Sequence, residues 1–93
     1  MNWDEFIERY LMNHEEFKFK YKNYIVELLY SGDGIKFAYY ISEYIENETI
    51  FSKLKNRNKY LKFDEFNSPE ELLEKFSFDK KSFKEIWNEL EWK

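Results

Sequence analysis

The amino-acid sequence predicts an α+β fold, with an N-terminal helix, an antiparallel meander of four or five strands, and two C-terminal helices packed on one face of the sheet. Apolar residues recur every three or four positions near both ends of the chain but every second position in its middle. These periods are typical of helices and strands, respectively. Because a chain of 93 residues forms one core only, we expect a single domain over residues 1–93.

The predicted helices span about 3–12, 69–76 and 83–91. Each follows a residue whose side chain can accept a hydrogen bond from an unpaired backbone N–H, and each of these residues stands three positions before a glutamate: Asn2, Ser68 and Ser82. Pro69 strengthens the second start, because a proline in the first helical position lacks an N–H that would be unpaired anyway. The apolar spacing places the hydrophobic residues of each predicted helix on one face, which can pack against a sheet.

Residues 17–21 alternate aromatic and lysine side chains, which predicts a strand with one apolar and one polar face. The dipeptide Lys22-Asn23 is predicted to form a two-residue turn, because asparagine tolerates positive φ. That turn places Lys18 opposite Glu27, which is a favourable cross-strand pair of opposite charges. The sequence therefore predicts the register of the first hairpin as well as its existence.

A second turn is expected at residues 31–34, where two of the four residues are glycine. The strand that follows would place its apolar residues on the same sheet face as Val26 and Leu28: Ile35, Phe37, Tyr39 and Ile41. A fourth strand is expected at about 49–55, with either Ile50 or Phe51 facing inward. A short fifth strand is expected at 60–63.

The residue inventory argues against an enzyme. The chain has no cysteine, and its one histidine, His14, is expected near the end of the first helix, where a positive ring suits the helix dipole. Thiol catalysis and the usual zinc sites are thereby excluded. The glycine-bearing turn at 31–34 is followed by a strand, whereas phosphate-binding loops need a helix there. We expect no catalytic residue, no metal and no cofactor.

The chain's ends and composition indicate a protein of the cytoplasm. Its N-terminus is acidic where a signal peptide would be basic. The longest apolar run, from Phe37 to Ile41, is far shorter than the roughly 20 residues of a membrane span. The absence of cysteine fits a reducing compartment. We therefore expect a cytoplasmic protein that does not associate with membranes.

Charge is distributed unevenly along the chain. Residues 1–16 carry five acidic groups and one basic group, and residues 63–93 carry nine acidic and five basic groups. Residues 17–62, by contrast, carry nine basic and five acidic groups. The overall charge of −4 therefore hides a basic middle, the predicted sheet, between acidic helical ends.

The basic middle gives one hypothesis for function, because a cationic sheet face with aromatic residues can bind single-stranded nucleic acid. The candidate residues are those expected to point away from the core or to lie on the nearby turn: Lys18, Lys20, Lys36, Lys53, Lys55, Arg57, Lys59 and Lys62. An ordinary solvated face, whose lysines protect edge strands from aggregation, explains the same pattern. The scarcity of arginine, which occurs only twice, favours this second interpretation.

The acidic ends and the surplus of aromatic residues give the preferred hypothesis, a non-enzymatic module that binds a partner protein. Aromatic residues are enriched in protein interfaces, and rows of carboxylates can occupy a basic groove. The candidates are Tyr40, Tyr44, Phe51, Tyr60, Trp92, Glu70, Glu71 and Glu74. In size and composition the chain resembles small orphan proteins of low-G+C bacteria and their phages, which include inhibitors and immunity proteins. That resemblance implies a protein that blocks a functional site on its target, and self-association into a homodimer is an alternative use of the same surface.

Overall fold

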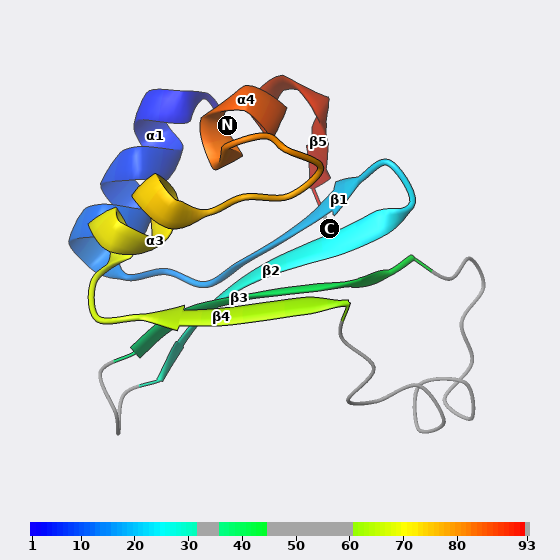
Figure 1. Cartoon of the computed structure of the whole chain (residues 1–93). Coiled ribbons are helices and arrows are strands. Elements are labelled where there is room, and N and C mark those ends of the chain that lie inside the picture. The colour runs from blue at the N-terminus through cyan, green and yellow to red at the C-terminus, as the bar shows by residue number, and fades with distance from the viewer. Residues whose placement is uncertain (32–35, 45–60, 93) are drawn as a thin grey trace, which may run out of the picture.

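The protein has an α+β fold, as the sequence predicts (Figure 1). The computed structural model describes residues 1–31, 36–44 and 61–92. Within these residues the elements are α1 (Trp3–Ile7), a π-helical turn (Glu8–Met12), β1 (Phe17–Tyr21), β2 (Tyr24–Ser31), β3 (Lys36–Glu43), β4 (Lys62–Phe66), α3 (Pro69–Lys75), α4 (Phe83–Ile86), a 3-10 turn (Trp87–Glu89) and β5 (Leu90–Trp92). No helix in the described ranges combines the length and the apolar content that crossing a membrane requires.

All three helix starts confirm the capping predictions. The side chains of Asn2 and Ser68 each accept a hydrogen bond from the backbone N–H three residues later, at 2.8 and 3.1 Å. Ser82 does the same at 3.2 Å, and Glu85 returns the interaction by accepting from the backbone N–H of Ser82 at 2.9 Å. This reciprocal pair is a complete capping box, which satisfies two otherwise unpaired donors at once.

The end of the chain corrects the prediction of a helix over 83–91. The α-helix stops at Ile86, a single 3-10 turn follows, and residues 90–92 form β5 instead. In this strand Leu90 pairs with Tyr21 and packs against the core. Residues 90–92 therefore form backbone hydrogen bonds with the edge of β1 that would otherwise be unpaired, and not within a helix. This pairing also keeps the apolar side chain of Leu90 against the core.

The five strands form an antiparallel sheet in the order β4-β3-β2-β1-β5. The predicted hairpin register is confirmed, with Lys18 opposite Glu27. Its two-residue turn is also confirmed, but the positive φ of 52° belongs to Lys22 and not to Asn23. The predicted strand at 49–55 lies outside the described residues.

Strand β4 begins and ends later than the fifth strand predicted at 60–63, and this changes which way Lys62 faces. Because Phe66 pairs with Phe37, Lys62 pairs with Ile41 and shares the core side of the sheet. Its ammonium donates to the backbone carbonyl of Ser77. The prediction that Lys62 joins the outward-facing lysines is therefore wrong, because a shift of one residue in a strand turns every side chain to the other face.

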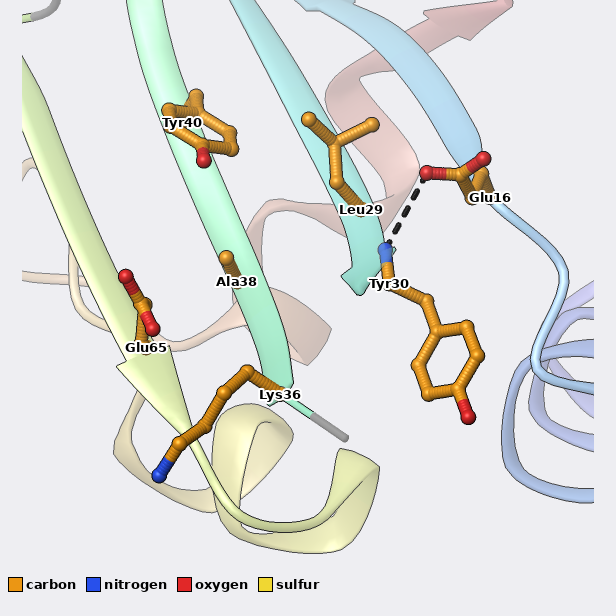
Figure 2. A pocket seen from close by; sticks show the side chains of 7 residues that line it. All are labelled: Glu16, Leu29, Tyr30, Lys36, Ala38, Tyr40 and Glu65. Carbon is orange, nitrogen blue, oxygen red and sulfur yellow. Dashed lines mark hydrogen bonds between the residues drawn. The ribbon is translucent and has the colours of Figure 1, made fainter. Parts of the chain in front are cut away.

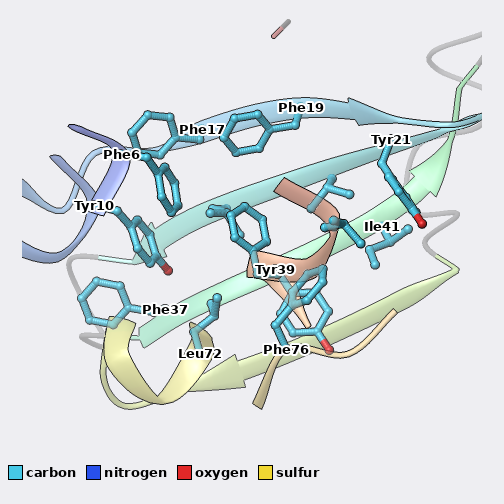
Figure 3. Packing of buried hydrophobic residues seen from close by; sticks show 14 residues of the cluster. Phe6, Tyr10, Phe17, Phe19, Tyr21, Phe37, Tyr39, Ile41, Leu72 and Phe76 are labelled. Atoms are coloured by element: carbon cyan, nitrogen blue, oxygen red, sulfur yellow. The ribbon is translucent and has the colours of Figure 1, made fainter. Parts of the chain in front are cut away.

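Aromatic rings dominate the core, which lies between the helices and one face of the sheet (Figure 3). The ring of Phe6 is central, with centroid distances of 5.0 Å to Phe17, 5.2 Å to Phe83 and 4.9 Å to Trp87. The predicted inward residues of the first three strands that the structure describes are buried: Phe17, Phe19, Tyr21, Val26, Leu28, Phe37, Tyr39 and Ile41.

Side chains that alternate with these buried residues form the opposite side of the sheet, which we call the outer face. It comprises Lys18, Lys20, Ile25, Glu27, Leu29, Lys36, Ala38, Tyr40, Ser42, Phe63, Glu65 and Glu91. In Figure 1 no labelled helix lies over this side of the sheet. Within the described part of the chain, the outer face is therefore the broad sheet surface that is not packed against helices.

Candidate functional site

The outer face contains a hollow of about 480 Å³ at the end of the sheet where β2 ends and β3 begins (Figure 2). Its lining residues come from β2, β3, β4 and the segment that leads into β1: Glu16, Leu29, Tyr30, Lys36, Ala38, Tyr40 and Glu65. We refer to it as the hollow. Volumes of this order are typical of sites that receive a small ligand or a side chain of a partner.

Ala38 forms the floor of the hollow and explains why it exists. In the sheet Ala38 pairs with Leu29 on one side and Glu65 on the other. The neighbours of Ala38 on the same face of β3 are Lys36 and Tyr40, which are also much larger. A methyl group among four longer side chains leaves a depression, and Ala38 itself is only 7% exposed at its base.

Charged side chains stand on both sides of this apolar floor. Figure 2 shows the carboxylates of Glu16 and Glu65 on opposite sides of Ala38. The carboxylate of Glu16 is held in place because its Oε2 accepts a hydrogen bond from the backbone N–H of Tyr30 at 3.2 Å. The hollow also has a cation, but the ammonium of Lys36 donates to the side-chain oxygen of Asn67 in the loop before α3.

One residue that lines the hollow, Tyr40, belongs to an aromatic pair. Tyr40 and Phe63 are opposite each other on β3 and β4, and their rings stack with centroids 4.7 Å apart. Phe63 is 43% exposed, although it is one of the largest apolar side chains. The sequence prediction includes Tyr40 but misses Phe63, because the predicted register turns Lys62 outward in its place.

The lysines predicted to bind nucleic acid do not form a uniformly positive face within the described residues. Lys18 is opposite Glu27, and Lys20 is opposite Glu91 with its ammonium 4.4 Å from the centre of the Tyr44 ring. Together with Lys36 they give the outer face three lysines, which are matched by three glutamates: Glu27, Glu65 and Glu91. Four further candidates lie outside the described residues: Lys53, Lys55, Arg57 and Lys59.

The residues predicted to bind a protein are split between two sides of the molecule. Tyr40 belongs to the outer face, whereas α3 packs Leu72 into the core and so carries Glu70, Glu71 and Glu74 on the helical side. Trp92 is in β5, where its backbone pairs with Phe19. Phe51 and Tyr60 lie outside the described residues.

The carboxylates of α3 have local structural roles. Glu70 and Glu71 occupy the first turn, where negative charge interacts favourably with the helix dipole. Glu71 also lies 3.8 Å from the ammonium of Lys75, one turn later. These roles account for Glu70 and Glu71 without a partner, so the outer face is the stronger candidate for a functional surface.

The described residues offer no group of three or more histidine, cysteine or carboxylate side chains placed to hold a metal ion. His14 follows the π-helical turn with a φ of 53°, and its ring lies 5.0 Å from that of Phe37 and 5.4 Å from that of Tyr30. These contacts give His14 a packing role. Comparison with known proteins finds no matching family model, no matching curated protein and no matching solved structure.

Proposed function

We propose that the protein is a small non-enzymatic binding module whose outer face holds a partner protein. The observation that carries the proposal is the hollow, on a surface with no labelled helix over it (Figure 1). One of its lining residues, Tyr40, stacks on the exposed ring of Phe63. Interfaces commonly anchor on aromatic side chains next to pockets that exclude water. By covering a functional site of its partner, such a module acts as an inhibitor or an immunity protein.

The dimensions of the sheet support this proposal. The five strands have 5, 8, 8, 5 and 3 residues. At about 3.3 Å per residue and about 4.8 Å between strands, they give a face of roughly 460 Å². A standard interface buries about 800 Å² on each partner. The outer face therefore supplies more than half of one standard contact, and the side chains at its borders add to it.

The balance of charge favours protein over nucleic acid as the partner. Nucleic-acid affinity depends on cations that neutralise phosphates, and affinity falls steeply with salt for that reason. On the outer face, the three lysines face an equal number of glutamates. A mixed face of this kind is better suited to the polar rim and apolar centre of a protein interface.

A photocrosslinking pair tests the proposal. A benzophenone amino acid replaces Phe63 in one variant and Met12 in the other, since Met12 is 76% exposed on the helical side. In a lysate of the source organism, the Phe63 variant is expected to crosslink to one discrete protein, and the Met12 variant is not. Crosslinking from Met12 alone contradicts the proposal, and a nucleic-acid adduct at Phe63 favours the alternative.

A matched pair of charge substitutions gives a second measurement. Phe63→Glu and Met12→Glu each introduce one carboxylate at an exposed apolar position. Circular dichroism checks that both variants fold. Loss of the partner from the Phe63→Glu complex only is the expected result, whereas equal retention by both variants rules out the outer face as the contact.

A further inference from the structure

We infer that the hollow receives a basic segment of the partner protein, with an arginine side chain placed between Glu65 and the ring of Tyr40. This inference rests on the proposed function and names the chemistry of the partner at the same site. It follows from three features of the hollow: the charge of its walls, the aromatic ring at its border, and the spacing of its two carboxylates.

The walls of the hollow favour a cation. No ion pair between described residues involves Glu16 or Glu65. The lining residues include two carboxylates and one ammonium, and that ammonium, of Lys36, donates to Asn67 in the loop before α3. The whole chain has a net charge of −4, which attracts a basic partner over long range.

The ring of Tyr40 favours arginine in particular. A guanidinium group stacks on aromatic faces and pairs with a carboxylate through two parallel hydrogen bonds. Both interactions already occur elsewhere in this protein. Arg9 donates to both carboxylate oxygens of Glu15 at 2.9 and 2.8 Å, and the guanidinium carbon of Arg9 lies 5.4 Å from the centre of the Phe17 ring.

The spacing of the carboxylates predicts how the segment is arranged. Glu65, Ala38 and Leu29 are neighbours in one row across β4, β3 and β2, and Glu16 comes directly before β1 at the other end of that row. Three strand spacings of about 4.8 Å separate the backbones of the two glutamates by roughly 14 Å. In an extended chain, side chains four residues apart point the same way and are about 13 Å apart. An extended segment with two arginines at that separation fits the row.

Peptide titrations followed by NMR test this inference directly. The probe is an acetylated and amidated ten-residue glycine-serine peptide with two arginines four positions apart. Control peptides contain two glutamates instead, or two adjacent arginines. Binding of the probe is expected to shift the amide signals of Ala38, Tyr40 and Glu65, with weaker effects from adjacent arginines and none from glutamates. Shifts confined to the helical carboxylates contradict the inference.

A matched pair of variants tests whether the peptide binds in the hollow or is held by general electrostatic attraction to the outer face. Glu65→Gln and Glu91→Gln each remove one carboxylate from the outer face, but only Glu65 lines the hollow. Loss of a charge-assisted pair predicts a roughly tenfold weaker binding of the probe for Glu65→Gln and less than a twofold change for Glu91→Gln. Ala38→Leu fills the floor without changing charge and is expected to weaken binding by a similar factor. Equal effects of the two glutamine variants overturn the inference.

The same variants distinguish this inference from the proposed function. If Phe63→Glu releases the partner protein while Glu65→Gln and Ala38→Leu retain it with unchanged affinity, the outer face is the interface and the basic segment is not its ligand. If Phe63→Glu retains the partner as well, the proposed function itself fails. If the two hollow variants and Phe63→Glu all weaken the complex, both proposals are supported.

Discussion

Replacing Tyr10 with phenylalanine is expected to stabilise this protein. The Tyr10 side chain is 1% exposed, and its hydroxyl has no hydrogen-bond partner within the described structure. Burial, together with the nearby charge of Glu70, raises the pKa of Tyr10 well above its usual value. A buried hydroxyl that lacks a partner costs about 1–3 kcal/mol. Phenylalanine removes that cost and keeps the stacked ring contact with Phe6, whose centroid is 5.5 Å away.

The expected gain is about 1 kcal/mol of unfolding free energy, at the low end of that range because removing the oxygen also leaves a small void. For a domain of this size, such a gain raises the melting temperature by about 4–8 °C. Urea unfolding measures it, with circular dichroism and tryptophan fluorescence as independent probes. The slope of free energy against urea concentration is expected to stay constant, since the surface exposed on unfolding hardly changes.

Tyr39 supplies the matched control, because its ring is equally buried but its hydroxyl donates to the carboxylate of Asp64 at 3.1 Å. Burial and this hydrogen bond raise the pKa of Tyr39 to about 12. Tyr39→Phe is expected to lower the unfolding free energy by about 1 kcal/mol. The reasoning is refuted if Tyr10→Phe is destabilising to the same degree, since the Tyr10 hydroxyl would then be paired or hydrated in the folded protein.

Three further predictions concern the segment between α3 and α4. Lys80 has a φ of 61°, so Lys80→Gly is expected to raise the urea midpoint by relieving about 1 kcal/mol of backbone strain. Ser82→Ala removes the capping box and should lower unfolding free energy by about 1 kcal/mol in the same assay. The hydrogen bond and ion pair with Lys22 lower the pKa of Asp79 below 3.8. The folded-state pKa therefore lies below the unfolded one, so this stabilisation is present above about pH 4 and disappears as the pH falls. Asp79→Asn should flatten the acid limb of a stability profile.

Local features of the chain made the first hairpin and the helix starts predictable. The turn after Tyr21 has two residues, which leaves one register that puts every aromatic side chain on the same face. The charge pair of Lys18 and Glu27 agrees with that register. A cap such as Ser82 likewise acts within four residues of itself, so its partner Glu85 can be identified from the sequence.

Elements that depend on distant partners were less predictable. Trp87 and Leu90 satisfy a helical period, but they satisfy equally well a short turn followed by a strand. The strand forms because the edge of β1 is unpaired, and the sequence around Leu90 does not indicate where that edge lies. Strand β4 shows the same dependence, since the direction of Lys62 follows from the pairing of Phe66 with Phe37. Register between strands that are far apart in the sequence is set by the packed core.

The hollow has a signal in the sequence, although one that acquires meaning only with the sheet. Ala38 is the only alanine of a chain in which 23% of the residues are aromatic. From the sequence alone, a small residue on a solvated strand does not predict a depression, because its neighbours across the sheet are unknown. Here those neighbours are Leu29 and Glu65, and the next outward residue along β3 is Tyr40. The larger side chains around Ala38 on the outer face leave a depression above its methyl group, and two carboxylates line that depression. We infer both the partner protein and its basic side chain from this depression.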